Sequence, residues 1–442
     1  MVSERADIAV IGAGAAGVMA AIAAGRAAME AGAGLRIVAL DGAKTLGAKV
    51  LVAGGGRCNV THHHVDERAY AGSSRHSIRN VLGRFDVPRT IAFFREIGVE
   101  LKQEDTGKLF PTTDRARTVL DALLSEARRV GVELWHPWRV ASVRAFDGGF
   151  EVQREVAEAC DEVRSLVARR VILATGGKAL PKSGSDGQGY SIAKSLGHTM
   201  TPRIFPALVP LTTPEGHFLR ELSGVSVPAE VIVRGAGAKA IASFTNSVLL
   251  THFGLSGPAI LDASRYLADA RHADPQAALV LNFAPGSAPG DLDQTLVSAK
   301  GPGIARWLAE SLVFHARVPG HTNRGLPERL SRALCEHAKV DPSAPVQSLT
   351  RAQRTAIVSA VTSLAVPITG DRGFTHAEVT AGGVPLAEVR LDAMESRATP
   401  GVHLCGEICD VDGRIGGFNF QWAWSSGHIA GSAAARSLIA GT

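Results

Sequence analysis

Long apolar runs are missing from this sequence, and their absence argues against a protein with membrane-spanning helices. No stretch approaches the roughly 18–20 uninterrupted apolar residues of a membrane helix, so we expect no membrane partner. The apolar segment Ile8–Ala24 follows Glu4, Arg5 and Asp7, and its glycine motif explains it better than a signal peptide does. We therefore expect a cytoplasmic protein.

Cysteine is also scarce. The five cysteines are odd in number, with no C-x-x-C pair and no histidine spacing that completes a zinc site. This pattern predicts reduced thiols and no metal, and it leaves open whether the two cysteines around Gly406-Glu407 ever form a bond. The cysteines are Cys58, Cys160, Cys335, Cys405 and Cys409.

Neither sign of charge dominates the composition. The 47 Lys and Arg exceed the 42 Asp and Glu by a formal net charge of +5, and the hydrophobic share of 45% is that of an ordinary globular protein. This mild excess permits an anionic partner without demanding one. At 442 residues, the chain is expected to form two or three domains, each with its own core.

Glycine is abundant, and its most informative cluster follows the β-branched run Ile8–Ile11. Gly12-x-Gly14-x-x-Gly17 passes directly into an Ala-rich segment, which predicts a strand, a tight turn and a helix over 15–32. Gly12 would make the turn, Gly14 would admit a pyrophosphate, and Gly17 would let the helix lie close to the strand. The diphosphate would then bind free N–H groups at the helix N-terminus.

A second apolar strand, Leu35–Leu40, ends in Asp41, close to the spacing at which a carboxylate binds ribose hydroxyls. A solvated Asp after a Gly/Ala-rich helix is the alternative. This order of strand, turn, helix and strand favours a dinucleotide-binding fold.

Residues 47–61 contain three consecutive glycines followed by Arg-Cys-Asn, which predicts a loop that passes close to a ligand. Arg57 would face an anionic or electron-rich group there, and a flexible loop with a chance arginine is the alternative. The adjacent His62-His63-His64 is expected to be a solvated loop rather than a metal site, because neighbouring side chains diverge and no other ligands complete a set.

Two later segments predict further approaches to the same ligand. Residues 168–174 are typical of a buried strand and end in Thr175-Gly176-Gly177, for which a simple β-turn is the alternative. Gly416-Gly417 precedes a helix whose N–H groups would stabilise the negative charge that a reduced flavin carries at N1/O2. Trp422 and Trp424 on this helix are expected to be core residues. Three approaches suit a cofactor as long as FAD, and without a second G-x-G-x-x-G any nicotinamide would bind transiently beside the flavin.

The remaining sequence suggests helices over 77–99 and 115–130 and a β-meander over 133–134, 139–145 and 150–155. From 198 to 372, recurring prolines and short strand-like runs predict a small β-barrel or sandwich with added helices. The predicted helices of this segment have cationic faces, which are either solvated or in contact with nucleic acid. The cationic residues include Arg324, Arg329, Arg332, His337 and Lys339.

Several of these strings are specific enough to identify a family. The sequence resembles, across nearly its full length, the BaiN/RdsA family of NAD(P)/FAD-dependent oxidoreductases, also called aminoacetone oxidase family FAD-binding enzymes. His62 stands where Asn is expected, and Asp41 where Glu is commoner. Besides the Gly12–Gly17 fingerprint, the matching strings are Gly54–Thr61, Phe110-Pro111, Ala174–Lys178 with Pro181-Lys182, Gly184–Tyr190, Thr251–Pro258, Val379–Val384, Met394–Ser396 and Gly406–Gly427.

The resemblance implies an α/β fold: a Rossmann-like FAD-binding domain of the glutathione-reductase type in two segments, 1–197 and 373–442. Residues 198–372 would form an inserted β-barrel and helical substrate domain. The implied function is an FAD-dependent oxidoreductase that passes hydride from NAD(P)H through flavin N5 to a conjugated C=C bond, in a steroid-like acid or a 23S rRNA uridine. A flavin amine oxidase acting on a small amine and a flavin-bearing binding or regulatory protein are the alternatives.

For the chemistry, we expect Cys58 or His252 to donate a proton and Arg57 to stabilise charge. The choice of NADH or NADPH and the oligomeric state stay open. The residues expected to bind the cofactor are Gly12, Ala13, Gly14, Ala15, Ala16, Gly17, Asp41, Lys49, Gly55, Gly56, Arg57, Asn59, Val140, Ala174, Thr175, Gly176, Gly177, Gly406, Glu407, Asp412, Gly416, Gly417, Phe418 and Asn419.

Overall fold

The computed structural model describes residues 2–155 and 163–440. The chain divides into two compact units, the first formed by Met1–Pro206 and Glu378–Thr442 and the second by Ala207–Ala377. The predicted changeovers after residues 197 and 372 precede these boundaries by nine and five residues. Each unit has its own hydrophobic core.

The first unit is built on a sheet whose central strands are parallel in the order β7-β2-β1-β10-β22. Ile8 lies opposite Ile37 of β2, and the strands β1, β2 and β10 consist largely of buried aliphatic residues at their carboxyl ends, as a sheet covered on both faces requires. The bounds are β1 (Val2–Ile11), β2 (Ile37–Leu40), β7 (Val132–Trp135), β8 (Val140–Phe146), β9 (Gly149–Arg154), β10 (Val163–Leu173), β20 (Val389–Arg390), β21 (Glu395–Ser396) and β22 (Val402–Leu404).

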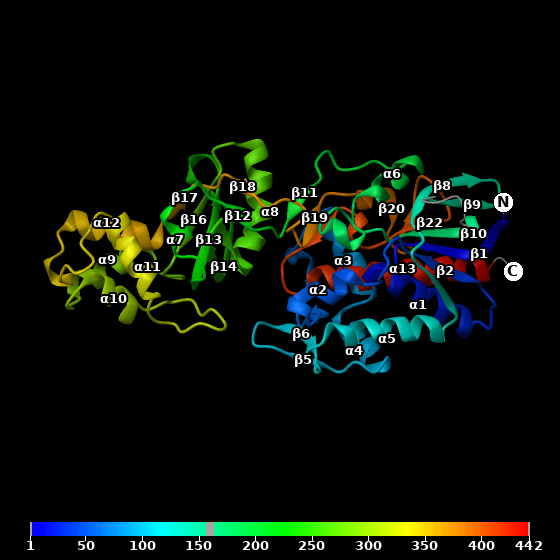
Figure 1. Ribbon diagram of the computed structural model, residues 1–442, viewed down its shortest axis with the longest axis horizontal. Coiled ribbons are helices and arrows are strands. Elements are labelled where there is room, and N and C mark those ends of the chain that lie inside the picture. Colours follow the sequence, from blue (N-terminus) through cyan, green and yellow to red (C-terminus); the bar gives the residue numbers. More distant parts are fainter. Residues whose placement is uncertain (1, 156–162, 441–442) are drawn as a thin grey trace. The chain divides into compact units, whose positions relative to one another are not determined.

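The helices α1 (Ala15–Glu30) and α13 (Phe418–Ile439) lie side by side, although they come from opposite ends of the chain (Figure 1). Small residues permit this close contact. A Cβ added at Gly427 would lie 2.4 Å from the Ala16 carbonyl oxygen, and one at Gly431 would lie 1.9 Å from that of Ala20. The packing therefore fixes the N-termini of both helices relative to each other.

The structure corrects two sequence predictions in this unit. The helix expected over 77–99 is broken into α3 (Arg75–Arg84) and α4 (Val87–Glu96), because the Asp86 side chain accepts the Arg89 N–H and caps a new helix that has Pro88 in its first turn. Strand β7, expected in a meander, instead pairs in parallel with β2. Of the three strands in the predicted meander, β8 and β9 do form an antiparallel pair, and β9 also pairs with β10.

The remaining elements of the first unit are shorter. Residues 48–52 are helical where a loop was expected, but Ala53, Gly54 and Gly55 depart from helical geometry. The bounds are α2 (Ala48–Gly56), β3 (Thr61–His62), β4 (Tyr70–Gly72), β5 (Leu101–Gln103), β6 (Lys108–Pro111), α5 (Ala116–Arg129), α6 (Gln188–Ser195), β11 (Phe205–Ala207), β19 (Val379–Ala381) and β23 (Val411–Gly413).

The second unit contains a seven-stranded antiparallel sheet in the order β17-β16-β13-β14-β15-β12-β18. Alternate residues of β13, such as Val227 and Val231, are fully buried, and α8 packs on β13 and β14. The bounds are β12 (Leu211–Thr212), α7 (Phe218–Glu221), β13 (Ser226–Arg234), β14 (Ala240–Thr251), β15 (Gly254–Ser256), α8 (Pro258–Ala273), β16 (Ala278–Asn282), α9 (Pro289–Ser298), α10 (Ile304–Glu310), α11 (Glu328–His337), α12 (Arg351–Thr362), β17 (Leu364–Val366) and β18 (Gly370–Asp371).

Four cysteines lie in the described residues, and all four are buried free thiols: Cys58, Cys335, Cys405 and Cys409. Cys160 lies outside the described residues. Across residues 2–155 and 163–440, no helix combines the length and hydropathy that crossing a membrane requires.

Candidate functional site

The glycine turn after β1 is shaped by close backbone contacts. Gly12 has a φ of +95°, and a Cβ there would lie 2.5 Å from the Ala174 carbonyl oxygen. A Cβ at Gly17 would lie 1.8 Å from the Gly12 carbonyl oxygen. At Gly14, in contrast, a Cβ would meet nothing within 4 Å. Gly12 and Gly17 are therefore required by the fold, whereas the space above Gly14 is open to a ligand.

Helix α1 begins with a bare N-terminus. Its cap, Gly14, offers no side-chain acceptor, and the first turn contains no acidic residue. The N–H groups of Ala15, Ala16 and Gly17 start the helix, where the macrodipole favours an anion. This arrangement is what the binding of a diphosphate requires.

Asp41 follows β2 and is already engaged by the backbone. One carboxylate oxygen accepts the Ala13 N–H at 2.7 Å, and the other accepts the Ala43 N–H at 2.8 Å. Ala13 is predicted to contact the cofactor, and in the structure its N–H holds Asp41. Each oxygen keeps a second lone pair, so Asp41 can still accept from a ribose hydroxyl.

The segment after β10 approaches the same turn. The Ala174 N–H donates to the Ile11 carbonyl at 2.8 Å, and Gly176 has a φ of +73°. The buried Thr175 hydroxyl has no hydrogen-bond partner among the described residues. Since buried polar groups are normally paired, this oxygen is available to a ligand.

Gly406 and Glu407 lie against this segment and against α1. A Cβ at Gly406, which has a φ of +76°, would lie 2.7 Å from the Ala16 Cβ. The Glu407 carboxylate accepts the Thr380 N–H at 3.0 Å and pairs with the Lys49 ammonium at 2.9 Å. Both charged side chains are partly exposed. Because the Lys49 ammonium balances the Glu407 carboxylate, the pair adds no net negative charge near the N-terminus of α1.

A second bare helix N-terminus belongs to α13. Its cap, Gly417, has a φ of +96°, and a Cβ there would lie 2.6 Å from the backbone of Thr61. The first turn has no acidic residue and no side-chain cap. The Asn419 amide, predicted to bind the cofactor, is bonded to the backbone N–H and carbonyl of Gly413 at 2.8 and 2.9 Å. It therefore braces the end of strand β23, which carries the buried Asp412.

Arg57 is turned toward the β5–β6 hairpin. Its guanidinium lies 2.6 Å from a Glu104 carboxylate oxygen, 3.6 Å from one of Asp114, and 4.1 Å above the Phe110 ring. Its charge is thus compensated, and the predicted role in stabilising charge on a ligand requires Arg57 to leave these partners.

Cys58 and Asn59 are both buried, but they differ in what their side chains can offer a ligand. The Cys58 side chain is fully buried with a φ of +61°, and burial raises the pKa of its thiol to about 12. A thiol that no substrate reaches and that holds its proton so strongly is a poor acid, so the structure argues against the predicted donor role of Cys58. The buried Asn59 side-chain oxygen has no partner among the described residues and is free to accept from a ligand.

Among the other predicted contacts, Gly55 and Gly56 have open space beside them, whereas Val140 is buried. Gly55 has a φ of +68° and open space where a Cβ would point, as a loop beside a ligand requires. Gly56, at φ +85°, is nearly as open. Val140 is buried in β8, and its carbonyl accepts the Gln188 side-chain amide at 3.2 Å.

His252 lies in the second unit, in the turn between β14 and β15. Its side chain is exposed, and its backbone carbonyl accepts the Arg220 guanidinium N–H at 2.6 Å. An exposed imidazole can exchange protons with a substrate. Its role as an acid stays a prediction.

The histidine triplet is more ordered than expected. The His62 ring stacks on Phe418 at 5.0 Å, and its Nε2 lies 3.0 Å from the Thr106 carbonyl oxygen. Burial lowers the pKa of His62 below its usual value. The described residues contain no group of three or more potential metal ligands.

Several structural partners of the site were not predicted. The buried Thr380 hydroxyl accepts the Lys178 and Ala179 N–H groups at 2.7 and 3.0 Å and thereby holds the Gly-Gly segment. Buried Gln421 accepts from the Thr61 hydroxyl and donates to the Phe85 carbonyl. Thr380 lies in the string Val379–Val384, which was a usable signal, whereas nothing local distinguishes Gln421.

The two tryptophans on α13 are core residues, as expected, with exposed fractions of 2% and 0%. They also carry polar contacts. The Trp422 indole N–H donates to the Gly406 carbonyl at 3.0 Å, and that of Trp424 donates to the Val60 carbonyl at 2.9 Å. They therefore tie α13 to two of the loops around the site.

The residues present fit FAD. Two bare helix N-termini suit a diphosphate and a negatively charged ring, the open sides of Gly14 and Gly55 leave room for a ligand, and the unpaired oxygens of Thr175 and Asn59 offer acceptors. This fold and donor set define the class: the chain is an FAD-dependent oxidoreductase. More particularly, it belongs to the HI0933-like protein Rossmann domain family, which matches residues 6–433.

Named relatives confirm the resemblance found in the sequence. A 3-dehydro-bile acid delta(4,6)-reductase of Clostridium scindens is 33% identical over 97% of this chain and 98% of its own length. A ribosomal RNA dihydrouridine synthase of Escherichia coli is 32% identical over 96% of both chains. Among solved structures, E. coli quinol fumarate reductase FrdA aligns with a TM-score of 0.52 at 15% identity, covering 100% of this chain and 71% of that one, which shows a shared fold.

Proposed function

We propose that this protein reduces a C=C bond conjugated to a carbonyl group, with NAD(P)H as the reductant. FAD would supply hydride transfer through N5: NAD(P)H is oxidised, and the acceptor gains a hydride on its electron-poor carbon and a proton on the neighbouring carbon. The observation that carries the proposal is the second bare helix N-terminus at Gly417, which suits a ring that becomes negative on reduction.

The names of the relatives support the same reaction type. One relative is named as a reductase of a 3-dehydro-bile acid and the other as a ribosomal RNA dihydrouridine synthase. Dihydrouridine is uridine whose ring C=C bond has been saturated, so both names denote saturation of a carbonyl-conjugated bond. The acceptor of this chain is therefore proposed to be an enone-like small molecule or an rRNA uridine.

The residues of the chain would hold the cofactor and move protons. The N–H groups at the start of α1 would bind the diphosphate, and Asp41 a ribose. The ion pair between Lys49 and Glu407 would hold the segments that carry these two residues next to each other beside the cofactor. His252 is the remaining candidate for the proton donor, since Cys58 is sealed from substrate.

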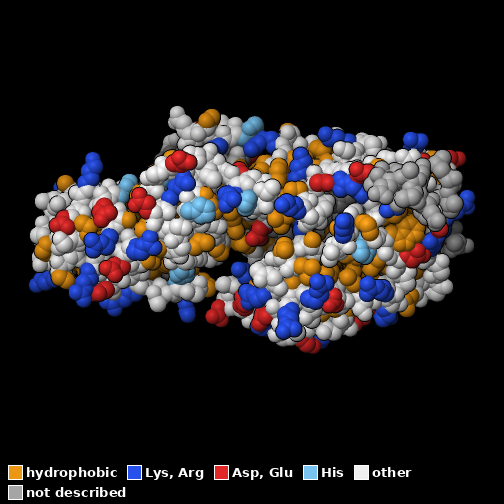
Figure 2. All heavy atoms as spheres, viewed as in Figure 1, with side chains coloured by type: hydrophobic (Ala, Val, Ile, Leu, Met, Phe, Trp, Pro, Cys, Tyr) orange, Lys and Arg blue, Asp and Glu red, His pale blue; other side chains and the backbone are white. Residues whose placement is uncertain are grey.

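An RNA acceptor gains support from the second unit. Residues 300–354 contain nine Lys or Arg and four Asp or Glu, an excess of positive charge suited to phosphates. Figure 2 shows Lys and Arg side chains over this region, with Asp and Glu among them. Arg306 and Arg354 pair with acidic partners, whereas Arg324, Arg332 and Lys339 have no ion pair among the described residues.

The first test is an absorption spectrum of the purified protein, followed by anaerobic addition of NADH and then NADPH. We expect a flavin spectrum that one of the two nucleotides bleaches and that an enone restores. Flavin that both nucleotides leave oxidised, but that a small amine bleaches, would instead favour an amine oxidase. Flavin reduced by none of these, nor by dithionite, would favour a binding or regulatory role.

The second test distinguishes the acceptors. If the substrate is rRNA, deletion of the gene should remove one dihydrouridine from the 23S rRNA of the host, and the purified protein should restore it with NAD(P)H. Unchanged dihydrouridine in the deletion strain would exclude the RNA acceptor while leaving the reductase proposal intact.

A further inference from the structure

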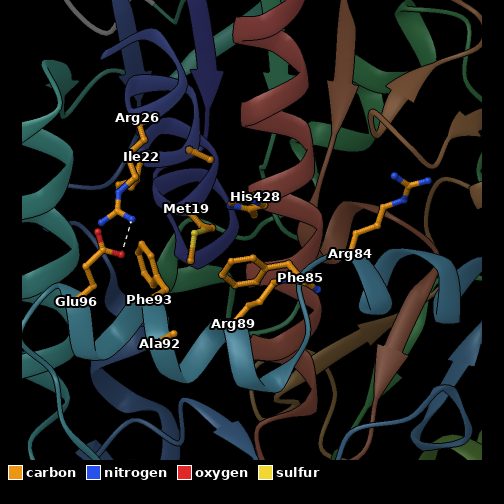
Figure 3. A pocket seen from close by; sticks show the side chains of 11 residues that line it. Met19, Ile22, Arg26, Arg84, Phe85, Arg89, Ala92, Phe93, Glu96 and His428 are labelled. Atoms are coloured by element: carbon orange, nitrogen blue, oxygen red, sulfur yellow. Dashed lines mark hydrogen bonds and ion pairs between the residues drawn. The ribbon is translucent and has the colours of Figure 1, made fainter. Parts of the chain in front are cut away.

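A pocket of about 320 Å³ lies on the first unit, between α1, α4 and α13. Figure 3 shows its lining: Met19 and Ile22 project from α1, Phe93 and Ala92 from α4, and His428 from α13 above Phe85. The pocket shares no residue with the predicted cofactor site.

The walls of the pocket are mainly apolar and aromatic. Phe85 stacks on His428 at 4.4 Å with an interplanar angle of 26°, and its ring stands 6.4 Å from that of Phe93 at 72°. Met19 and Ile22 are fully buried and form the floor, whereas Ala92 is exposed. Such a surface binds the apolar part of a ligand, and the volume is at the lower end of small-molecule sites, roughly 300–1,000 Å³.

The charged residues of the lining favour an anion, because they comprise three arginines and one glutamate. Arg26 is held by Glu96 at 3.0 Å and by Glu126 at 2.6 Å. Arg84 bonds the Asn80 side chain and points away from the pocket (Figure 3). Arg89 has only an exposed contact of 3.4 Å with Asp86 and a bond to the Gly83 carbonyl. Arg89 is therefore the guanidinium that can turn to a ligand.

His428 adds an unused polar group. Neither of its ring nitrogens has a hydrogen bond among the described residues, and the ring is only partly buried. Burial, together with the charges of Arg436, Arg26 and Arg89, lowers its pKa to about 4, so the imidazole is neutral at pH 7. A neutral imidazole offers one donor and one acceptor to a ligand without opposing an anion.

We propose that this pocket binds a small amphipathic carboxylate of the medium-chain fatty acid type, with its apolar chain between Phe85 and Phe93 and its carboxylate at Arg89. An apolar body with a single anionic group matches an apolar cavity that has one available guanidinium at its edge. The pocket lies on the sides of α1 and α13, the two helices whose N-termini form the cofactor cradle. The proposal does not depend on the substrate of the enzyme.

The test is isothermal titration calorimetry of the FAD-loaded protein with decanoate, below its micelle concentration, and with decanol and decylammonium as matched probes. We expect saturable one-to-one binding of decanoate, with decanol about two- to fivefold weaker, as the loss of one exposed ion pair predicts. Decylammonium should bind more weakly than decanol. Equal binding of all three probes, or no saturable binding of decanoate, would overturn the proposal.

Three variants locate the binding. Arg89→Gln should lower decanoate affinity to that of decanol, whereas Arg95→Gln, an exposed arginine on the same helix outside the pocket, should not. Ala92→Phe should fill the pocket and weaken decanoate binding by more than about tenfold while FAD content stays unchanged. Undiminished binding to the Ala92→Phe variant would place decanoate elsewhere, and self-association of the wild type that Ala92→Phe abolishes would make the pocket an interface between copies; either result refutes the proposal.

Discussion

At the residue scale, Cys58 shows that a residue in a distinctive sequence motif can serve packing rather than catalysis. Its string, Gly-Gly-Gly-Arg-Cys-Asn, is far more specific than the Gly12–Gly17 fingerprint alone, yet the thiol is fully buried beside glycines of positive φ and has a pKa raised to about 12. Its contribution is then to packing. A small apolar side chain at this position holds the loop that carries Asn59, a predicted cofactor contact.

A substitution tests this view. Cys58→Ala should keep NAD(P)H-driven reduction of an acceptor within about twofold of wild type, while the missing sulfur lowers the free energy of unfolding by roughly 1–2 kcal/mol. His252→Ala is the comparison, because the loss of a general acid costs about 100-fold or more. The measurements are steady-state turnover and urea unfolding. A large loss of turnover in Cys58→Ala with full flavin content would return the acid role to the thiol.

At the element scale, the contact between α1 and α13 determines whether the cradle forms. The helices approach so closely that backbone carbonyls of α1 occupy the space where side chains at Gly427 and Gly431 would lie. Since each helix supplies one of the two bare N-termini, a change in their separation alters both at once.

Gly431→Ala should therefore destabilise the protein and weaken FAD binding together. The added Cβ would lie 1.9 Å from the Ala20 carbonyl oxygen, and such overpacking costs about 1–3 kcal/mol. Gly83→Ala is the matched control: Gly83 lies in helix α3 with nothing within 4 Å of the added Cβ, so this change should stabilise by roughly 0.5–1 kcal/mol. Urea unfolding and the flavin-to-protein ratio measure both effects. Similar effects of the two variants would show that the close approach of the helices is unimportant.

The elements that could be predicted from the sequence are those that local patterns determine. The β1–α1–β2 unit follows from apolar periodicity and from three glycines with distinct backbone requirements. The break between α3 and α4 was missed, although Asp86-Val87-Pro88 is a local helix-start pattern from which it could have been predicted. The place of β7 was not predictable, because it depends on a parallel partner almost one hundred residues earlier.

The site shows the same division. The glycine turns and the bare helix N-termini were predictable because their geometry depends on the backbone of short segments. The partners of Arg57 were not, since Glu104 lies in the β5–β6 hairpin and Asp114 in the loop that follows it, both far from Arg57 in the sequence. The roles of Thr380 and Gln421 likewise depend on contacts between distant segments, which the periodicity of a single sequence does not encode.

At the scale of the whole molecule, the two units divide the work of the proposed enzyme. The first contains every predicted cofactor residue, and the second contains His252 and the cationic helices. Formal charge alone does not make the chain an RNA-binding protein, because its excess is only +5 over 442 residues. The local excess of positive charge in residues 300–354 is more informative, because RNA phosphates are attracted by the electrostatic potential of the surface near them.

A triple variant, Arg324→Gln with Arg332→Gln and Lys339→Gln, tests whether this charge binds RNA. If all three side chains bind phosphates, the magnitude of the slope of log K against log salt for a 23S rRNA fragment should fall by about 2–3, at roughly 0.7–0.9 for each phosphate that is no longer neutralised. Reduction of a small enone should be unchanged, because it needs no phosphate binding. Fluorescence anisotropy across a salt series measures the slope.

The control for this variant neutralises Arg75, Arg95 and Arg128, three exposed arginines of the first unit, and so makes the same change in net charge. An equal fall in slope for both triples would mean that RNA responds to net charge alone. No fall for either would leave an enone-like small molecule as the acceptor, since a reductase of such a substrate has no need of the cationic helices. A fall confined to the first triple would assign RNA binding to the inserted unit, separately from the cofactor cradle, and the two functions would then be open to independent mutation.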